Sequence, residues 1–273
     1  MTRIVNNCVA LVCLCLFWGQ SLRAADASHS EQIKWGNESV FNEEHNTLGL
    51  FSGVLGGQIV LAGGTSDDYS RWGRNAVCLS ENAGFALYED VLSKPLAYGA
   101  SITLSDGILC IGGRDSSQCY EDVFFVTMQQ GKLNVSEDWP PLPFPLSNAA
   151  GALLDNKVYL FGGRKSVSPS RLSDSFFVLD LSNKSRGWKE LPGYPGCVRE
   201  DAILVVQNNG VSPCLYLLGG QTETEEGLSS CLTDGYVYNP QLGKWSSLGS
   251  DFPKGICAAV ASGANHRSEE RRV

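Results

Sequence analysis

The feature that most constrains this chain is a pair of adjacent glycines that recurs four times, each time at the end of a short apolar run. The runs are Gln58–Gly64, Gly107–Gly113, Lys157–Gly163 and Cys214–Gly220. The second glycines stand at 64, 113, 163 and 220, so successive doublets are 49, 50 and 57 residues apart. Self-similarity at such a period indicates one structural unit repeated along the chain, in which each unit buries its faces against its neighbours.

Each repeat carries the signals of four antiparallel strands. A strand of small residues, such as Asn148–Leu154, is followed by a turn and by the apolar strand that ends in Gly-Gly. A polar loop then leads to a third strand and to an outer strand that begins at tryptophan. The third strands are Asp122–Thr127, Ser175–Asp180 and Gly235–Asn239, and the outer strands start at Trp139, Trp188 and Trp245. The sequence therefore predicts an all-β fold, a kelch-type β-propeller of four-stranded antiparallel blades.

Two parts of the chain depart from this scheme. The segment between Gly64 and Pro95 has no clear outer-strand tryptophan, so we expect that blade to be irregular or shortened. The small-residue run Ala258–Gly263 predicts the first strand of one more unit. We expect the tryptophans of the outer strands to pack between blades rather than to stack on sugars.

The chain divides into a leader, a propeller and a tail. Arg3, the apolar run Cys8–Trp18 and the small residue Ala24 are typical of a signal peptide over residues 1–24, and an uncleaved anchor is the alternative. Residues 25–44 are polar and form an irregular lead-in, residues 45–266 form a partial propeller, and residues 267–273 are a charged tail. We expect an exported protein, periplasmic or extracellular, that has no membrane segment once the signal is cleaved.

Charge and composition exclude several classes of function. The formal net charge is −8, so the basic excess that a nucleic-acid partner requires is absent. The only three histidines lie near the two ends of the sequence, at 29, 45 and 266, so we predict neither a bound metal nor a cofactor.

Seven cysteines remain beyond the predicted signal peptide, and they contain no CxxC pair that would indicate a zinc site. Cys110 and Cys119 flank one loop after a glycine doublet, and Cys214 and Cys231 flank another. An exported protein permits the disulfides Cys110–Cys119 and Cys214–Cys231 across these two hairpins. The alternative is a set of small buried thiols.

The strand order predicts where a ligand binds. In an antiparallel blade, the loop between the second and third strands lies on the same rim as the link to the next blade. These loops carry Arg71, Arg74, Arg114, Arg164, Arg171 and Arg199. Guanidinium groups match carboxylates, so we predict an anionic ligand, with Arg199, Glu200, Arg114, Arg164 and Arg71 as candidate binding residues. The alternative is that loops are polar in any case and that Arg199 is a structural residue at the start of a blade.

Several segments resemble the cyclically permuted mutarotases, which are kelch propellers similar to the sialic-acid mutarotases (N-acetylneuraminate epimerases). These segments are Leu48–Gly64, Pro95–Ser101, Asp106–Gly113, Leu142–Gly151, Lys157–Gly163, Trp188–Arg199 and Gly255–His266. The resemblance implies a six-bladed parent that exchanges the anomers of sialic acid or a related sugar without a cofactor. It also implies that this chain is a C-terminally truncated version, because the family continues beyond the segment that ends at His266.

The resemblance assigns no catalytic residue. The family places a proposed catalytic glutamate and arginine in a Gly-Glu-x-Lys-Pro-Gly-x-Arg-like loop, and this sequence contains no match to it. Thr65–Asp68 also stands where the family carries an Ala-Asn-Phe-Pro-like segment. Two hypotheses follow: a mutarotase-like protein for a small, anionic sugar, which is inactive if the loop is essential, or a non-catalytic kelch propeller that binds a carbohydrate or a protein. The Ser-x-Asp-x-Gly-x-x-Trp boxes of sialidases and the histidine ligands of copper propellers are absent.

Overall fold

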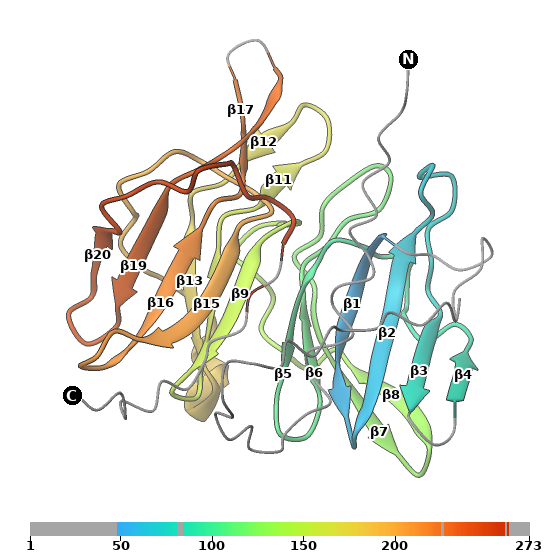
Figure 1. Cartoon of the computed structure of the whole chain (residues 1–273). Helices are drawn as coiled ribbons and strands as arrows, with labels where there is room; N and C mark the ends of the chain where they lie inside the picture. The colour runs from blue at the N-terminus through green and yellow to red at the C-terminus, as the bar shows by residue number, and fades with distance from the viewer. Residues whose placement is uncertain (1–47, 81–83, 225–226, 260, 262–273) are drawn as a thin grey trace, which may run out of the picture.

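The computed structural model describes residues 48–80, 84–224, 227–259 and 261. Residues 1–47 and 262–273 are outside this part, so the signal peptide, the lead-in and the charged tail stay predictions. The described residues form an all-β structure with four sheets of four antiparallel strands (Figure 1). The predicted fold class is therefore confirmed, as a β-propeller with four described blades.

The four blades follow one another along the chain, and in each the strands run outward in sequence order. Blade I contains β1 (Leu48–Leu55), β2 (Gln58–Thr65), β3 (Ala76–Ser80) and β4 (Gly84–Tyr88). Blade II contains β5 (Ala100–Thr103), β6 (Ile108–Ile111), β7 (Val123–Gln129) and β8 (Lys132–Ser136). Blade III contains β9 (Ala150–Leu154), β10 (Lys157–Phe161), β13 (Phe176–Asp180) and β14 (Lys189–Glu190), with the short 3-10 helix η2 (Leu181–Arg186) before β14. Blade IV contains β15 (Ile203–Asn208), β16 (Pro213–Leu218), β19 (Gly235–Asn239) and β20 (Lys244–Ser247).

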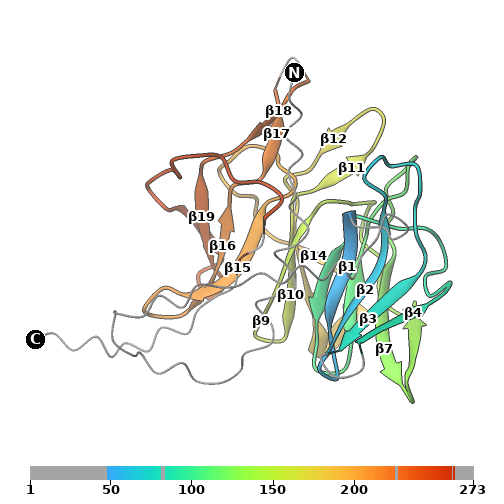
Figure 2. The same cartoon turned by 45° about the vertical axis from the view of Figure 1, so that its right-hand side comes forward.

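The inner strands share a centre. β1 contacts β5, β5 contacts β9, and β9 contacts β15, so the first strand of each blade faces a common axis. Two hairpins extend the loops after the glycine doublets: β11 (Arg164–Ser166) with β12 (Arg171–Leu172), and β17 (Gln221–Glu223) with β18 (Ser229–Cys231). Figures 1 and 2 show both hairpins at the same end of the molecule. The loops after the doublets therefore gather on one rim, as the strand order predicts.

Hydrophobic side chains fill the space between successive blades. Blades I and II bury Phe51 against Phe124, and blades II and III bury Leu109 near Leu160. Blades III and IV enclose an aromatic cluster that contains Tyr159, Phe161, Phe176, Tyr194 and Tyr238, with Trp245 packed against it. Blades II and III thus each contribute to two cores and blades I and IV to one, so each described blade depends on a neighbour for its core.

The glycine doublets join each blade to the next. The amides of Gly64, Gly113, Gly163 and Gly220 donate hydrogen bonds of 2.7–2.8 Å to carbonyl groups in the link that enters the following blade. The first glycine of each doublet lies so close to that link that a Cβ atom would stand 2.1–2.5 Å from the same carbonyl oxygen. Such a separation is far below van der Waals contact, so only glycine fits there. The doublets are therefore required by contacts between blades.

Three strand predictions need correction. Blade I is a complete four-stranded sheet, because Gly84–Tyr88 supplies its outer strand without tryptophan. The outer strand of blade II is Lys132–Ser136 and ends before Trp139. The two prolines that follow Trp139 have no backbone N–H group to donate to a neighbouring strand. Residues 258, 259 and 261 are described without strand pairing, and the rest of the predicted Ala258–Gly263 strand lies outside the described residues. Trp139, Trp188 and Trp245 do pack against the cores between blades.

Both predicted disulfides are wrong. Cys231 is bonded to Cys257, while Cys110, Cys119 and Cys214 are buried free thiols. Cys110 packs in the core between blades I and II, and the Cys119 thiol instead contacts the hydroxyl of Ser147. Cys214 lies at the start of β16, whereas Cys231 pairs with Gln221 beyond the end of that strand. About seven residues of extended chain separate the two ends, roughly 20 Å, which no disulfide spans.

Candidate functional site

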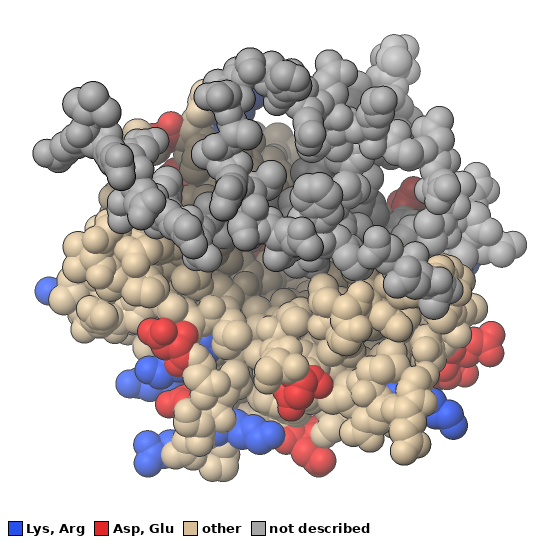
Figure 3. Space-filling model, turned by 60° about the horizontal axis from the view of Figure 1, so that its bottom comes forward, with Lys and Arg blue, Asp and Glu red and all other residues tan. Residues whose placement is uncertain are grey.

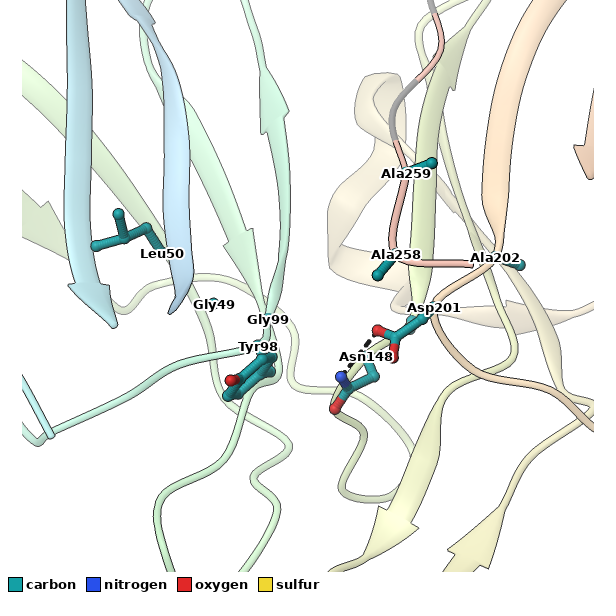
Figure 4. A pocket seen from close by; sticks show the side chains of 10 residues that line it. Gly49, Leu50, Tyr98, Gly99, Asn148, Asp201, Ala202, Ala258 and Ala259 are labelled. Carbon is teal, nitrogen blue, oxygen red and sulfur yellow. Dashed lines mark hydrogen bonds between the residues drawn. The ribbon is translucent and has the colours of Figure 1, made fainter. Parts of the chain in front are cut away.

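A pocket of about 200 Å³ opens at the propeller axis, between the inner strands (Figure 4). Its wall is built from five pairs of residues, of which four lie at or just before the start of an inner strand: 49–50, 98–99, 148–149, 201–202 and, without strand pairing, 258–259. Pockets that enclose small ligands typically measure about 300–1,000 Å³, so this one has room for only part of such a ligand.

The first residue of each pair occupies an equivalent position in its repeat, which we call the hub position. The five hub residues are Gly49, Tyr98, Asn148, Asp201 and Ala258, and all have φ between 49° and 64°. Their backbones form a chain of hydrogen bonds around the axis, in which each amide donates to the hub carbonyl of the previous repeat over 2.7–3.0 Å. Residues other than glycine rarely have a positive φ. Its recurrence shows that the inter-blade hydrogen bonds impose it, and it places the five hub residues together in the pocket wall.

Asp201 is held by two amide side chains. Asn148 Nδ2 donates to Asp201 Oδ1 over 2.9 Å, and Gln221 Nε2 donates to Oδ2 over 3.0 Å. Burial raises the pKa of the Asp201 carboxyl above its usual value, and the negative charge of Glu200 acts in the same direction, against the hydrogen bonds from the two amides. A carboxyl with a raised pKa in a pocket can accept and return a proton nearer to neutral pH than an exposed aspartate can.

Tyr98 lies on the other side of the pocket from Asn148 and Asp201, as Figure 4 shows. Burial of its phenol and a hydrogen bond with Tyr69 raise the pKa of Tyr98 well above the usual range, so the hydroxyl stays protonated. The face of its ring packs against Gly49, where a Cβ atom would be 2.8 Å from the ring. The phenol therefore has a fixed position at the pocket wall.

Arg199 is a structural residue. Its side chain is fully buried and donates to both carboxylate oxygens of Asp234 over 2.7 and 2.8 Å, to the carbonyl of Gly219 over 2.7 Å, and to the hydroxyl of Tyr194 over 2.8 Å. Because these contacts occupy the guanidinium within the protein, Arg199 is not available to a ligand. The prediction that it binds substrate is corrected, and the structural alternative holds.

Arg164 and Glu200 form a second buried pair. Arg164 Nε donates to Glu200 Oε2 over 2.8 Å, and its Nη2 bonds both Glu200 Oε1, over 2.5 Å, and Glu223 Oε1, over 3.1 Å. Glu200 is only 4% exposed, so its carboxylate makes its polar contacts with the protein rather than with water. The pair joins β11 of blade III to blade IV directly beside Asp201. It fixes the wall of the site, and its charges are balanced internally.

Arg114 is placed differently from these two. Its guanidinium carbon lies 4.7 Å from the centre of the Tyr98 ring and 5.2 Å from that of Trp72. Arg71 is exposed in the loop between β2 and β3, and it does not line the pocket. Of the predicted binding residues, the structure thus brings Arg114, Arg164 and Glu200 near the axis, buries Arg199 elsewhere, and leaves Arg71 on the rim.

Sequence reasoning missed the hub residues Tyr98, Asn148 and Asp201. A signal was present, because Leu96–Ala100, Leu146–Ala150 and Arg199–Ile203 align as equivalent repeat segments in which a polar residue at the middle position is followed by glycine or alanine. The prediction considered only arginines and a neighbouring glutamate as binding residues, so it did not include these positions.

Within the described residues, no group of three or more His, Cys, Asp or Glu is arranged to hold a metal ion. No helix of the described residues is long and apolar enough to cross a membrane. On the end of the molecule seen in Figure 3, the acidic and basic side chains that are not covered by grey atoms are interspersed, without a patch of one sign.

Part of the chain is similar to a known protein family. Residues 139–269 match the family model of N-acetylneuraminate epimerase. The N-acetylneuraminate epimerase of Yersinia pestis (strain Pestoides F) is 30% identical over 129 residues, 46% of this chain and 30% of that protein. The protein of the same name from Haemophilus influenzae (strain PittEE) is 31% identical over 131 residues, 48% of this chain and 32% of its own. The matched segment thus spans about a third of the length of these relatives.

The solved structure of YjhT has a similar fold. It superposes with a TM-score of 0.62 at 14% identity, covering 80% of this chain and 74% of that one. At this identity the likeness concerns the fold alone. The resemblance that the repeats predict is confirmed by the matched segment: over residues 139–269 this propeller is similar to the N-acetylneuraminate epimerases.

Proposed function

We propose that the protein binds a cyclic sugar of the sialic-acid class in the axial pocket and promotes exchange of its anomers. The observation that carries the proposal is the pair formed by Asp201 and Tyr98, which face the same pocket from two hub positions. The names of the relatives in the family supply the class of substrate.

The chemistry needs two proton transfers. A base removes the proton from the anomeric hydroxyl, the bond between the anomeric carbon and the ring oxygen breaks, and an acid protonates that oxygen. The open chain then closes on the other face and the protons return, so nothing is consumed. Asp201 suits the base because its pKa is raised toward the working range, and the protonated Tyr98 hydroxyl suits the acid or a hydrogen-bond donor to the ring oxygen. Asn148 and Gln221 orient the carboxylate.

The Cys231–Cys257 disulfide supports the related proposal that the protein is exported. Disulfides persist in oxidising compartments such as the periplasm and the extracellular space. The bond joins β18 to the residue directly before the hub residue Ala258, so it also holds that part of the pocket wall.

Anomer exchange of N-acetylneuraminate, followed by NMR, tests the proposal. The wild-type protein should accelerate exchange, and Asp201→Asn should lower the acceleration by about a hundredfold, the usual contribution of a general base. Asp106→Asn, in an exposed turn between β5 and β6, is the matched control and should have the wild-type rate.

Two other results would each select a different conclusion. A wild-type protein that binds the sugar without accelerating exchange would favour the non-catalytic propeller. That alternative follows from the sequence, which contains no Gly-Glu-x-Lys-Pro-Gly-x-Arg-like loop. Full activity in Asp201→Asn would show that the base is another group.

A further inference from the structure

We propose that Arg114, held over the rings of Trp72 and Tyr98 beside the axial pocket, binds the carboxylate of the ligand, so that the site selects an acid sugar over its neutral counterpart. The inference deepens the proposed function and rests on it. It follows from the contacts of Arg114 itself and from those of the arginines around it.

The position of the Arg114 side chain is fixed from two sides. Its backbone forms two hydrogen bonds with Ala97, of 2.8 and 2.9 Å between amide nitrogen and carbonyl oxygen. Arg114 therefore lies beside the segment that enters β5, the inner strand of blade II. The Trp72 and Tyr98 rings that face its guanidinium lie edge to face, 6.3 Å apart between centroids. Cation–π contacts of this kind hold a guanidinium plane while leaving its N–H groups free to bond in that plane.

Arg114 has unused hydrogen-bonding capacity. Its Nε atom is buried and has no hydrogen-bond partner. The terminal nitrogen Nη1 makes one long bond of 3.4 Å to the carbonyl of Asp115. A buried donor without a partner is costly, and a carboxylate that bonds Nε and a terminal nitrogen together would remove that cost.

The neighbouring cations are already neutralised. Arg164 bonds Glu200 and Glu223, and Arg199 bonds Asp234. Arg114 forms no ion pair with a carboxylate within the described residues, so its charge is available to an anion that arrives with the ligand. Arginine over an aromatic pair is therefore the anion subsite of this rim.

The subsite adjoins the proposed reaction centre through Tyr98. The Tyr98 phenol lies within electrostatic reach of both Arg114 and Asp201. A sugar acid that places its carboxylate on Arg114 would thus lie across Tyr98 with its ring toward Asp201. In N-acetylneuraminate the carboxylate is attached to the anomeric carbon itself, so an anion subsite beside the proposed reaction centre fits this acid.

Calorimetric titration with N-acetylneuraminate and with its methyl ester tests the inference. The ester keeps the anomeric hydroxyl and the ring but has lost the negative charge. The wild-type protein should bind the acid at least about tenfold more tightly, the usual value of a charge-assisted hydrogen bond to carboxylate. Arg114→Gln should bring the acid to the affinity of the ester, while the ester binds within about twofold of its wild-type affinity. Arg114→Lys should restore part of the preference, because an ammonium group keeps the charge and loses the bidentate geometry.

Arg186→Gln is the matched control. Arg186 is an exposed arginine in η2, and its replacement should leave the preference for the acid unchanged. Equal affinity of the wild-type protein for acid and ester would overturn the inference while leaving the proposed function intact, as would a preference that survives in Arg114→Gln. Failure of both ligands to bind the wild-type protein would overturn the proposed function and the inference together. Retained binding of the ester shows that Arg114→Gln is folded.

Discussion

The role of the glycine doublets predicts a large loss of stability from one methyl group. In Gly112→Ala the new Cβ would stand 2.2 Å from the carbonyl oxygen of Leu146, and the residue would keep a φ of +63°. The left-handed conformation costs a non-glycine residue on the order of 1–2 kcal/mol. Relief of the clash requires blades II and III to separate locally, which weakens the 2.8 Å hydrogen bond from Gly113 to Leu146, worth about 1 kcal/mol, and disturbs the packed core beside it by about 1–3 kcal/mol. We expect a total loss of about 3–6 kcal/mol.

Gly131→Ala separates the clash from the backbone strain. Gly131 has a φ of +74° in the turn between β7 and β8, and no atom would lie within 4 Å of its Cβ. Both variants change the entropy of the unfolded chain equally, so that effect cancels in the comparison. Urea unfolding should give a loss of about 1–2 kcal/mol for Gly131→Ala and at least about 2 kcal/mol more for Gly112→Ala. Losses that agree within about 0.5 kcal/mol would refute the view that the doublets act through contacts between blades.

Three further predictions concern charges and the disulfide. Arg199→Met should lower the unfolding free energy by about 3–5 kcal/mol, because it leaves Asp234 without its buried partner; urea titration that gives a loss below 1 kcal/mol would contradict this. Since the pKa of Asp201 is raised in the folded state, its contribution favours folding below the unfolded pKa, near 3.8, and is lost as pH rises through the folded pKa. Asp201→Asn should therefore gain stability relative to wild type between pH 4 and neutral; a pH-independent difference would disprove the shift. The disulfide at Cys257 closes a separation of 26 residues, so Cys257→Ser should cost about 3 kcal/mol in thermal unfolding, and wild type treated with dithiothreitol should match it.

The fold could be predicted because the repeat constrains it at several levels. The doublets, the turns and the apolar strands all recur at the same period, so each repeat independently predicts the same four-stranded blade. The outer strands were the weakest part, because Gly84–Tyr88 and Lys132–Ser136 are exposed edge strands whose pairing depends on register rather than on burial. Tryptophan marks the core between the blades, and it marks a strand only where the register happens to include it.

The site was predicted only to the level of the rim. Strand order places Arg114, Arg164 and Glu200 at the correct end, but sequence alone does not show which arginine has a carboxylate partner. Arg199 and Asp234 are 35 residues apart and are brought together by the pairing of the blade IV strands, because Arg199 lies in the link before β15 and Asp234 directly before β19. The disulfides failed for a similar reason, since proximity in sequence across a loop did not fix the direction of the side chains of Cys110 and Cys119.

The hub positions explain how such a repeat acquires a function without losing its fold. The backbone hydrogen bonds from one hub residue to the next fix φ near 50–64° whatever the side chain, and glycine, tyrosine, asparagine, aspartate and alanine all occupy the position. The strain of a non-glycine residue there, about 1 kcal/mol or more, is offset by hydrogen bonds that the five positions share. Glycine would avoid that strain at every hub position, so tyrosine at 98 and aspartate at 201 are costly choices for the fold. Both residues line the axial pocket, where the described blades converge, and there we expect the chemistry.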